Sequence, residues 1–279
     1  MPTDTWYSKD QPPTPTPSSL VDWARVVRRG LPLFCIVFGG LLFMLMVRVV
    51  ERPLNGIHRP WTPWITIGVC RAALKVLGIS HKVTGQMMTG QGAMVANHAS
   101  WLDIFALNAI GRIYFVSKAE VAAWPGIGWL ARATGTVFIK RDRTRAKHHV
   151  AEFQSRLAAG HKLLFFPEGT STDGLQVLPF KPTLFAAFLD ETLKDRIAIQ
   201  PVTIRYTAPP NADPRLYGWW GDMDFGPHLL ATLAAPTQGA IDVILHDPVR
   251  VAHYADRKTL AADLETQVRA GLSSDRRAE

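Results

Sequence analysis

The stretch "AMVANHASWLDIFALN", residues 93–108, places a histidine and an aspartate five residues apart, directly after a short apolar run. That run predicts a buried strand, and Ser100 is a residue type that favours the start of a helix. Asp103 would then lie in the first helical turn and His98 in the loop before it, so the loop can bring the imidazole to the carboxylate. Two interpretations remain open here: a catalytic pair, or a capping box that needs only Ser100 and Asp103.

Strand-like runs and helical patterns alternate along the chain beyond this stretch. Helical spacing of apolar residues is clearest over 145–159, before Gly160, and it recurs at Leu260, Leu264 and Val268. Such alternation predicts an α/β fold with a mostly parallel or mixed sheet covered by helices. The other strand-like runs are 81–85, 112–116, 136–140, 162–166, 197–206 and 241–246.

A second polar stretch, "LLFFPEGTSTDG" at 163–174, begins inside one of these strands. Glu168 follows the apolar run almost directly. Because active-site loops of open α/β sheets lie at the carboxyl ends of strands, we expect Glu168 at the same edge as His98, where it can meet a ligand. The alternative is a turn whose Glu168 side chain faces water.

The N-terminal part of the chain begins with a proline-rich segment and continues with apolar residues. Residues 11–17, "QPPTPTP", cannot form a helix, and we expect a disordered tail over 1–20. The run 31–47 carries no charge and is flanked by arginines on both sides. As a helix it would measure about 26 Å, slightly less than the ~30 Å hydrocarbon core of a bilayer.

A second apolar segment, 61–79, is interrupted by Arg71 and Lys75 and begins with two tryptophans, which is typical of a helix that lies in a membrane interface. We therefore expect a membrane-associated two-helix segment over 21–80 and one α/β domain over 81–279. Whether the first helix spans the bilayer or forms an interfacial hairpin with the second stays open. Two ordinary core helices are the remaining alternative.

Composition narrows the function classes. Hydrophobic residues make up 47% of the 279 residues, charged residues only 19%, and the net charge is +8. A basic chain can attract lipid headgroups or nucleic acid, but the apolar N-terminus and the lack of a recognition motif argue against nucleic acid. No metal-ligand spacing appears, so we expect no metal site. Cys35 and Cys70 lie in apolar runs and are expected to be buried thiols in a reducing compartment.

Four blocks of the sequence resemble the glycerolipid acyltransferase family, whose best-known members are lysophosphatidic acid acyltransferases. "NHASWLD" (97–103) fits the N-H-x-x-x-x-D motif and "FPEGT" (166–170) the second signature. "GTVFIKR" (135–141) and "IQPVTI" (199–204) resemble the intervening and last blocks. Four blocks in this order are far more specific than one motif, and the N-terminal helical pair resembles the membrane-binding element of some members.

The resemblance implies transfer of a fatty acyl group from a thioester of acyl carrier protein or coenzyme A to a hydroxyl of a lysolipid, with no bound cofactor. His98 would act as general base, and Asp103 would hold its tautomer and stabilise the imidazolium. Because the chain has no G-x-S-x-G elbow, no acyl-enzyme is expected. The residues that would hold the substrates are Lys140, Arg141, Glu168, Gly169, Thr170 and Ser171.

Departures from the family pattern bear on the acceptor. Ser171 stands where lysophosphatidic acid acyltransferases typically have an arginine, a natural phosphate ligand. This change and the stretch "GWWGDMDFGPHLL" (218–230) look more like bacterial lyso-ornithine lipid acyltransferases, which act on a lyso-aminolipid. Asp222 and Asp224 could pair with the ammonium of such an acceptor. Alternatively, they belong to an acidic surface loop beside membrane tryptophans.

Two other activities remain alternatives to lyso-aminolipid acylation. One is 1-acylglycerol-3-phosphate O-acyltransferase activity, which makes phosphatidic acid. The other is a non-catalytic membrane scaffold, which would need neither His98 nor Glu168. For the enzyme, the resemblance implies the bacterial inner membrane, with the catalytic domain on the cytoplasmic face.

Overall fold

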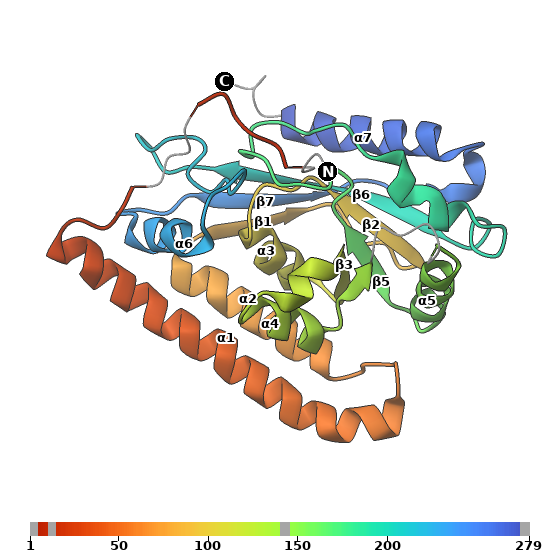
Figure 1. The fold of residues 1–279 in the computed structure, drawn as a ribbon, viewed down its shortest axis with the longest axis horizontal. Coiled ribbons are helices and arrows are strands. Elements are labelled where there is room, and N and C mark those ends of the chain that lie inside the picture. Colours follow the sequence, from red (N-terminus) through yellow and green to blue (C-terminus); the bar gives the residue numbers. More distant parts are fainter. Residues whose placement is uncertain (1–4, 11–14, 140–145, 274–279) are drawn as a thin grey trace.

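The protein is described here by a computed structural model, which covers residues 5–10, 15–139 and 146–273. An eight-stranded mixed sheet forms its centre, in the order β1-β7-β6-β2-β5-β3-β4, with β8 paired to β6 (Figure 1). β7 and β8 run antiparallel to β6, and the other neighbouring strands are parallel. The strands are β1 (Ser80–Thr84), β2 (Gly92–Ala96), β3 (Ile113–Lys118), β4 (Val137–Ile139), β5 (Lys162–Phe165), β6 (Ala198–Thr207), β7 (Ala240–Leu245) and β8 (Val249–Arg250).

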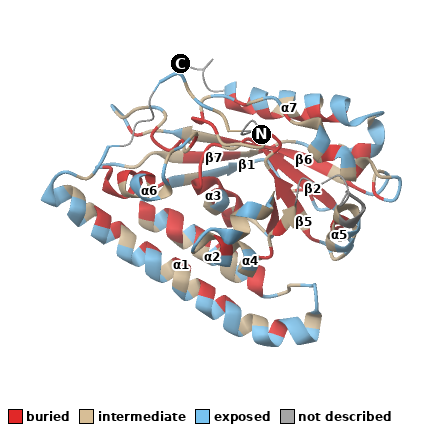
Figure 2. Cartoon of the chain, viewed as in Figure 1, coloured by how far each residue is buried: buried red, intermediate tan, exposed pale blue. Residues whose placement is uncertain are grey.

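Helices cover both faces of the sheet, which confirms the expected fold class. Along β2, Met94 and Ala96 belong to one hydrophobic cluster, and Ala93 and Val95 to the other, because successive side chains of a strand point to opposite faces. The central strands β2, β5 and β6 are almost continuously buried, whereas β1 is mostly exposed (Figure 2). One cluster includes residues of α1 (Leu20–Asn55), α2 (Thr62–Leu77), α3 (Leu102–Ile110) and α6 (Phe225–Ala234); the other includes residues of α5 (Ala146–Ala158), η3 (Pro182–Leu189) and α7 (Arg257–Ser273).

The central strands bring two loops to the same edge of the sheet. β2 pairs in parallel with β5 on one side and β6 on the other, with Val95 opposite Phe165. The loop after β2 and the loop after β5 therefore leave the sheet side by side. This is the edge at which the sequence predicts His98 and Glu168.

The N-terminal helix α1 lies along the α/β domain and packs against α2 (Figure 1). The two helices approach closely at Gly40, where a Cβ atom would lie 2.3 Å from a methyl group of Val69. Towards its start, the buried Arg29 donates to the carbonyls of Leu233 and Ala235. Towards its end, the buried Glu51 accepts from both the backbone N–H and the hydroxyl of Thr62. Contacts with the end of α6 and with the start of α2 thus hold α1 on both sides of its uncharged run.

The other face of α1 is apolar and exposed. By length and composition α1 is the one helix among the described residues that could cross a membrane. Its large exposed side chains include Leu31, Phe34, Leu42, Phe43, Met46 and Val49. Cys35 is also exposed there, so the expectation that both cysteines are buried is wrong for Cys35 and right for Cys70. A neighbour on one side and an apolar surface on the other fit a helix that contacts lipid.

The first residues of the chain contact the domain, although a disordered tail was expected over 1–20. The backbone N–H of Trp6 donates to the Thr170 hydroxyl at 3.3 Å, and its ring lies 6.1 Å from that of Trp220. The Tyr7 hydroxyl donates to Asp222 at 2.9 Å. These aromatic contacts attach residues 5–10 to the domain, while residues 11–14 lie outside the described part of the chain.

Candidate active site

His98 and Asp103 meet at the carboxyl edge of β2. The distance from His98 Nδ1 to Asp103 Oδ2 is 2.6 Å, and the imidazole stacks on Phe166 with ring centroids 4.0 Å apart. The His98 side chain is 21% exposed, whereas the Asp103 side chain is fully buried. Within the described ranges no hydrogen bond engages His98 Nε2, so this nitrogen can exchange a proton with a bound substrate.

Asp103 is held by four donors in total. Besides the His98 ring, Oδ2 accepts from the backbone N–H groups of Ala99 at 2.8 Å and Ser100 at 3.1 Å. Oδ1 accepts from the Tyr206 hydroxyl at 2.5 Å. Burial and the Asp103 carboxylate raise the pKa of Tyr206, so its hydroxyl stays protonated and remains a donor.

The two interpretations of Asp103 are therefore compatible. Helix α3 begins at Leu102, later than a cap at Ser100 would place it, and Trp101 at the cap position makes no side-chain capping bond. The Ser100 hydroxyl still accepts from the Leu102 N–H, and Asp103 accepts from the Ser100 N–H, as in a capping box. One carboxylate both orders the first turn of α3 and orients the imidazole.

The loop after β5 holds the backbone of His98 from both sides. The N–H of His98 donates to Glu168 Oε1 at 2.7 Å, and the carbonyl of His98 accepts from the Thr172 N–H at 2.9 Å. Asn97 adds a third attachment, because its amide side chain pairs with both the N–H and the carbonyl of Ile204 in β6. The position of the imidazole is thus set by three strands and not by the 97–103 loop alone.

Glu168 lies at the expected edge beside His98, but its side chain is buried. It is 1% exposed, and its second oxygen accepts from the Leu178 N–H at 2.8 Å, so it neither faces water nor points into an open site. Burial raises the pKa of Glu168 to about 8, and its two backbone hydrogen bonds oppose that rise only in part. Glu168 therefore braces two loops around His98.

The other predicted residues of this loop follow Glu168 directly. Gly169 adopts a positive φ of 75° where the chain turns, a conformation that favours glycine. Thr170 and Ser171 are half-buried, and the Thr170 hydroxyl accepts from the Trp6 N–H. The N-terminal segment thus reaches the residues that were expected to hold the acceptor.

Asp222 and Asp224 lie in the exposed loop before α6. Asp222 accepts from the Tyr7 hydroxyl, and Asp224 occupies the N-cap position of α6 without a capping bond from its side chain. The loop is connected to the catalytic loop, because the Trp219 N–H donates to the carbonyl of Ala99 at 2.8 Å. Both carboxylates are exposed next to the site, as either of their two interpretations requires.

Lys140 and Arg141 lie outside the described residues. The described part of the carboxyl edge contains another cationic pair, Lys118 at the end of β3 and Lys181. Burial lowers the pKa of Lys118, and the nearby charge of Lys181 lowers it further. Sequence reasoning missed this pair, although a lysine at the carboxyl end of a strand was a usable signal. It also missed Tyr206, whose position beside Asp103 depends on how β6 pairs with β2.

Comparison with known proteins identifies the family of the chain. Residues 80–205 match the model of the family described as Acyltransferase. The chain is 55% identical to a lyso-ornithine lipid O-acyltransferase of Rhodobacter capsulatus over 94% of this chain and 95% of that protein. It is 38% identical to a protein of the same name from Brucella abortus, over 73% of this chain and 80% of the relative.

A solved structure supports the fold. The 1-acyl-sn-glycerophosphate acyltransferase PlsC of Thermotoga maritima matches with a TM-score of 0.57 and 19% identity, over 88% of this chain and 97% of that chain. The family match and the relatives matched over most of their length include the loops of His98, Asp103 and Glu168. The chain therefore belongs to the glycerolipid acyltransferase family and is an acyltransferase.

Proposed function

We propose that the protein is a lysolipid O-acyltransferase that transfers a fatty acyl group from an acyl thioester to the hydroxyl of a lyso-aminolipid of the lyso-ornithine lipid type. The observation that carries this proposal is the His98–Asp103 pair, with Nε2 left for a substrate hydroxyl. Relatives named lyso-ornithine lipid O-acyltransferases over most of their length support the acceptor class. Because the chain is an acyltransferase, a non-catalytic scaffold is no longer an alternative.

The proposed reaction needs no acyl-enzyme. His98 Nε2 takes the proton of the acceptor hydroxyl while the oxygen attacks the thioester carbonyl. The C–O bond forms, the C–S bond breaks, and the imidazolium returns the proton to the leaving thiolate. Asp103, with its negative charge held by Tyr206 and two backbone N–H groups, stabilises the imidazolium between these steps.

The acceptor assignment rests on residues at the rim of the site. Ser171 cannot supply the charge that a phosphomonoester requires, and a charge-assisted hydrogen bond is worth ~1.5–3 kcal/mol, or roughly 10- to 150-fold in affinity. Asp222 and Asp224 supply exposed negative charge for an ammonium group instead. The donor is a thioester of acyl carrier protein or coenzyme A.

One observation favours the alternative acceptor, 1-acylglycerol 3-phosphate. Lys118 and Lys181 carry positive charge at the same sheet edge as His98 and could bind an acceptor phosphate. They could equally bind a phosphate of the acyl donor. Lysophosphatidic acid is therefore the second candidate substrate.

The test is the ratio of kcat/KM for lyso-ornithine lipid and lysophosphatidic acid with one labelled acyl donor. We expect wild type to prefer the aminolipid, and Ser171→Arg to shift the ratio towards the phosphate by roughly 10-fold. Asp222→Asn and Asp224→Asn should lower aminolipid turnover more than phosphate turnover. Efficient acylation of lysophosphatidic acid with no turnover of any lyso-aminolipid would overturn the acceptor assignment.

We also propose how the protein meets the membrane. Because α6 holds α1 at Arg29 and α2 holds it at Glu51, on both sides of the uncharged run, an interfacial arrangement of α1 and α2 is favoured over a free span. The exposed apolar face of α1 would contact acyl chains. The membrane is the bacterial inner membrane, with the catalytic domain on its cytoplasmic face.

A further inference from the structure

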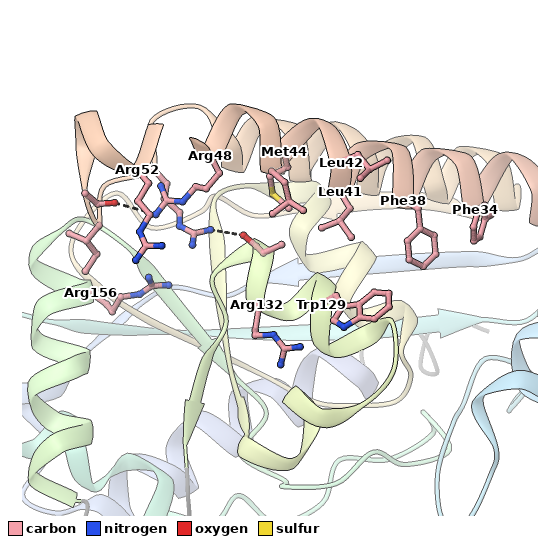
Figure 3. Close-up of a pocket in the computed structure, with 15 residues that line it drawn as sticks. Phe34, Phe38, Leu41, Leu42, Met44, Arg48, Arg52, Trp129, Arg132 and Arg156 are labelled. Atoms are coloured by element: carbon pink, nitrogen blue, oxygen red, sulfur yellow. Dashed lines mark hydrogen bonds between the residues drawn. The ribbon is translucent and has the colours of Figure 1, made fainter. Parts of the chain in front are cut away.

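An open groove of about 1180 Å³ lies between α1 and α4 (Ile127–Thr134), and one part of it is apolar. Its lining includes Phe34, Phe38, Leu41 and Leu45 of α1 and Trp129 of α4. Figure 3 shows the labelled apolar side chains following α1 away from a group of arginines. The exposed fractions of Phe34 and Trp129 are 60% and 59%, so this part of the groove is open to a long apolar ligand.

Five arginines line the groove, and Figure 3 shows Arg48, Arg52 and Arg156 together at its other end, with Arg132 near Trp129. They come from four parts of the chain: α1, the segment before α2, α4 and α5. Arg52, Arg132 and Arg156 each lie in the last turn of their own helix, where a basic residue suits the helix dipole. That effect does not account for Arg59, nor for the lining of one groove by arginines of four segments. The five, named here the arginine cluster, are Arg48, Arg52, Arg59, Arg132 and Arg156.

The positive charge of the arginine cluster is poorly balanced. Among the described acidic residues, Glu51 forms an ion pair with Arg48, and the negative charge of Glu152 favours the charged form of Arg156. Both oxygens of Glu51 also accept hydrogen bonds from the start of α2, so its negative charge is shared. The cluster therefore keeps an excess of positive charge.

Three of the other arginines donate hydrogen bonds to neutral carbonyls. Arg59 donates to Ala133, Arg132 to Ala122, and Arg156 to Gly135. Burial, together with the neighbouring arginines, lowers the pKa of Arg59 to about 10 and also lowers the pKa of Arg156. An anion in the cluster would relieve this repulsion.

The arginine cluster is at the opposite edge of the sheet from His98. Arg156 lies in α5, which leads into the start of β5, and the carbonyl of Gly135 that it contacts precedes β4. His98, in contrast, follows the end of β2. A ligand in the groove would therefore not reach the imidazole through the groove, which separates this site from the acyltransfer reaction.

We propose that the groove binds one anionic glycerophospholipid, with an acyl chain along α1 and the phosphate in the arginine cluster. Phe34 and Arg48 are separated by about 21 Å along the helix, more than the ~15 Å of one bilayer leaflet. The apolar wall is thus long enough for a lipid chain, and the exposed face of α1 gives access from the bilayer. Charge complementarity selects an anionic headgroup over a zwitterionic one.

The experiment measures lipid binding to the full-length protein in detergent by native mass spectrometry and by the shift in Tm. The probes are phosphatidylglycerol, phosphatidylcholine with identical acyl chains, and inorganic phosphate. We expect phosphatidylglycerol to bind most tightly. The variant Arg52→Gln with Arg132→Gln should weaken it roughly 10-fold or more, because charge-assisted contacts are lost.

Two variants separate this site from general attraction to lipid. Arg28→Gln removes one charge from an exposed position of the same helix outside the groove and should leave lipid preference unchanged. Leu45→Ser makes the apolar wall more polar. It should weaken the binding of phosphatidylglycerol and leave the binding of inorganic phosphate unchanged. The proposal would be overturned by equal binding of the two lipids, or by equal effects of Arg28→Gln and of the Arg52→Gln, Arg132→Gln double variant. It would also be overturned by an effect of inorganic phosphate as large as that of lipid, or by displacement of the lipid by acyl-coenzyme A at the same stoichiometry.

Discussion

The two edges of the sheet each contain a histidine stacked on an aromatic ring, but their electrostatics are opposite. His98 stacks on Phe166 at the carboxyl edge, and His161 stacks on Tyr114 at the amino edge, both with centroids 4.0 Å apart. His98 has the Asp103 carboxylate as a partner. Neither ring nitrogen of the buried His161 has a hydrogen-bond partner in the described structure, and Arg156 lies over the opposing Tyr114 ring.

The difference explains why only one histidine suits proton transfer. Burial and the neighbouring arginines lower the pKa of His161 to about 3, so its side chain remains neutral at physiological pH. Because it is buried, it is also inaccessible to a substrate. His98 has a carboxylate that can stabilise its protonated form and a free nitrogen that faces the site. An aromatic stack and an imidazole are common to both edges, whereas the nearby charge and the exposure decide function.

The same substitution at each edge should have very different effects on activity. His98→Phe and His161→Phe both retain a ring for stacking and remove the nitrogen atoms. We expect kcat/KM to fall by roughly 10²–10⁴-fold for His98→Phe, because the general base is lost, and to change little for His161→Phe. Steady-state kinetics on folded variants would measure this, and comparable losses at the two positions would contradict the contrast.

Asp103→Asn should also reduce activity strongly. An amide is nearly isosteric, but it cannot stabilise the imidazolium, and its NH₂ group can face the donors that now surround the carboxylate. We expect a fall in kcat of roughly 10²–10⁴-fold, with thermal unfolding reported alongside to exclude loss of α3. A variant with near-wild-type kcat would mean that Asp103 serves only to cap the helix.

The free energy of unfolding should depend on pH in opposite directions at the two edges. Glu168 has its pKa raised from 4.5 to about 8, so the folded state binds more protons, and this group lowers stability as pH rises from about 4.5 through about 8. His161 has its pKa lowered from 6.5 to about 3, so the unfolded state binds more protons, and this group lowers stability as pH falls from about 6.5 towards 3.

Denaturant unfolding between pH 4 and pH 9 would separate the two contributions. Glu168→Gln should reduce the loss of unfolding free energy at alkaline pH, and His161→Phe should reduce the loss at acid pH. Each reduction should be on the order of a few kcal/mol. Glu168→Gln should also cost stability at all pH values, because an amide NH₂ cannot accept from a backbone N–H. If either variant kept the wild-type pH slope on its side, the assigned protonation state of that residue would be wrong.

The smallest effect is expected at Tyr206. Tyr206→Phe removes one of the four donors to Asp103 and leaves the other three in place. We expect kcat/KM to fall by roughly 10-fold, about 1.4 kcal/mol, and the acceptor preference to remain unchanged. A loss as large as that of Asp103→Asn would indicate that Tyr206 contacts the substrate directly.

Much of the architecture followed from the sequence because it depends on local patterns. Every expected strand formed within a few residues of its predicted bounds, as did the helix after 145. The short β8, in contrast, has no alternating pattern of its own and exists through its pairing with β6. Gly271 lies inside α7, where a Cβ atom would be only 2.4 Å from the hydroxyl oxygen of Thr203.

The sequence alone determined that His98 and Asp103 would meet, since they are close along the chain and the loop between them is short. Tertiary structure decided the roles that depend on residues distant in sequence. It buried Glu168 between two backbone N–H groups and placed Tyr206 against Asp103. It also attached Trp6 to Thr170 and Tyr7 to Asp222, and it lined one groove with arginines of four segments. Pairing between distant strands and helices sets these distances, and no local periodicity encodes them.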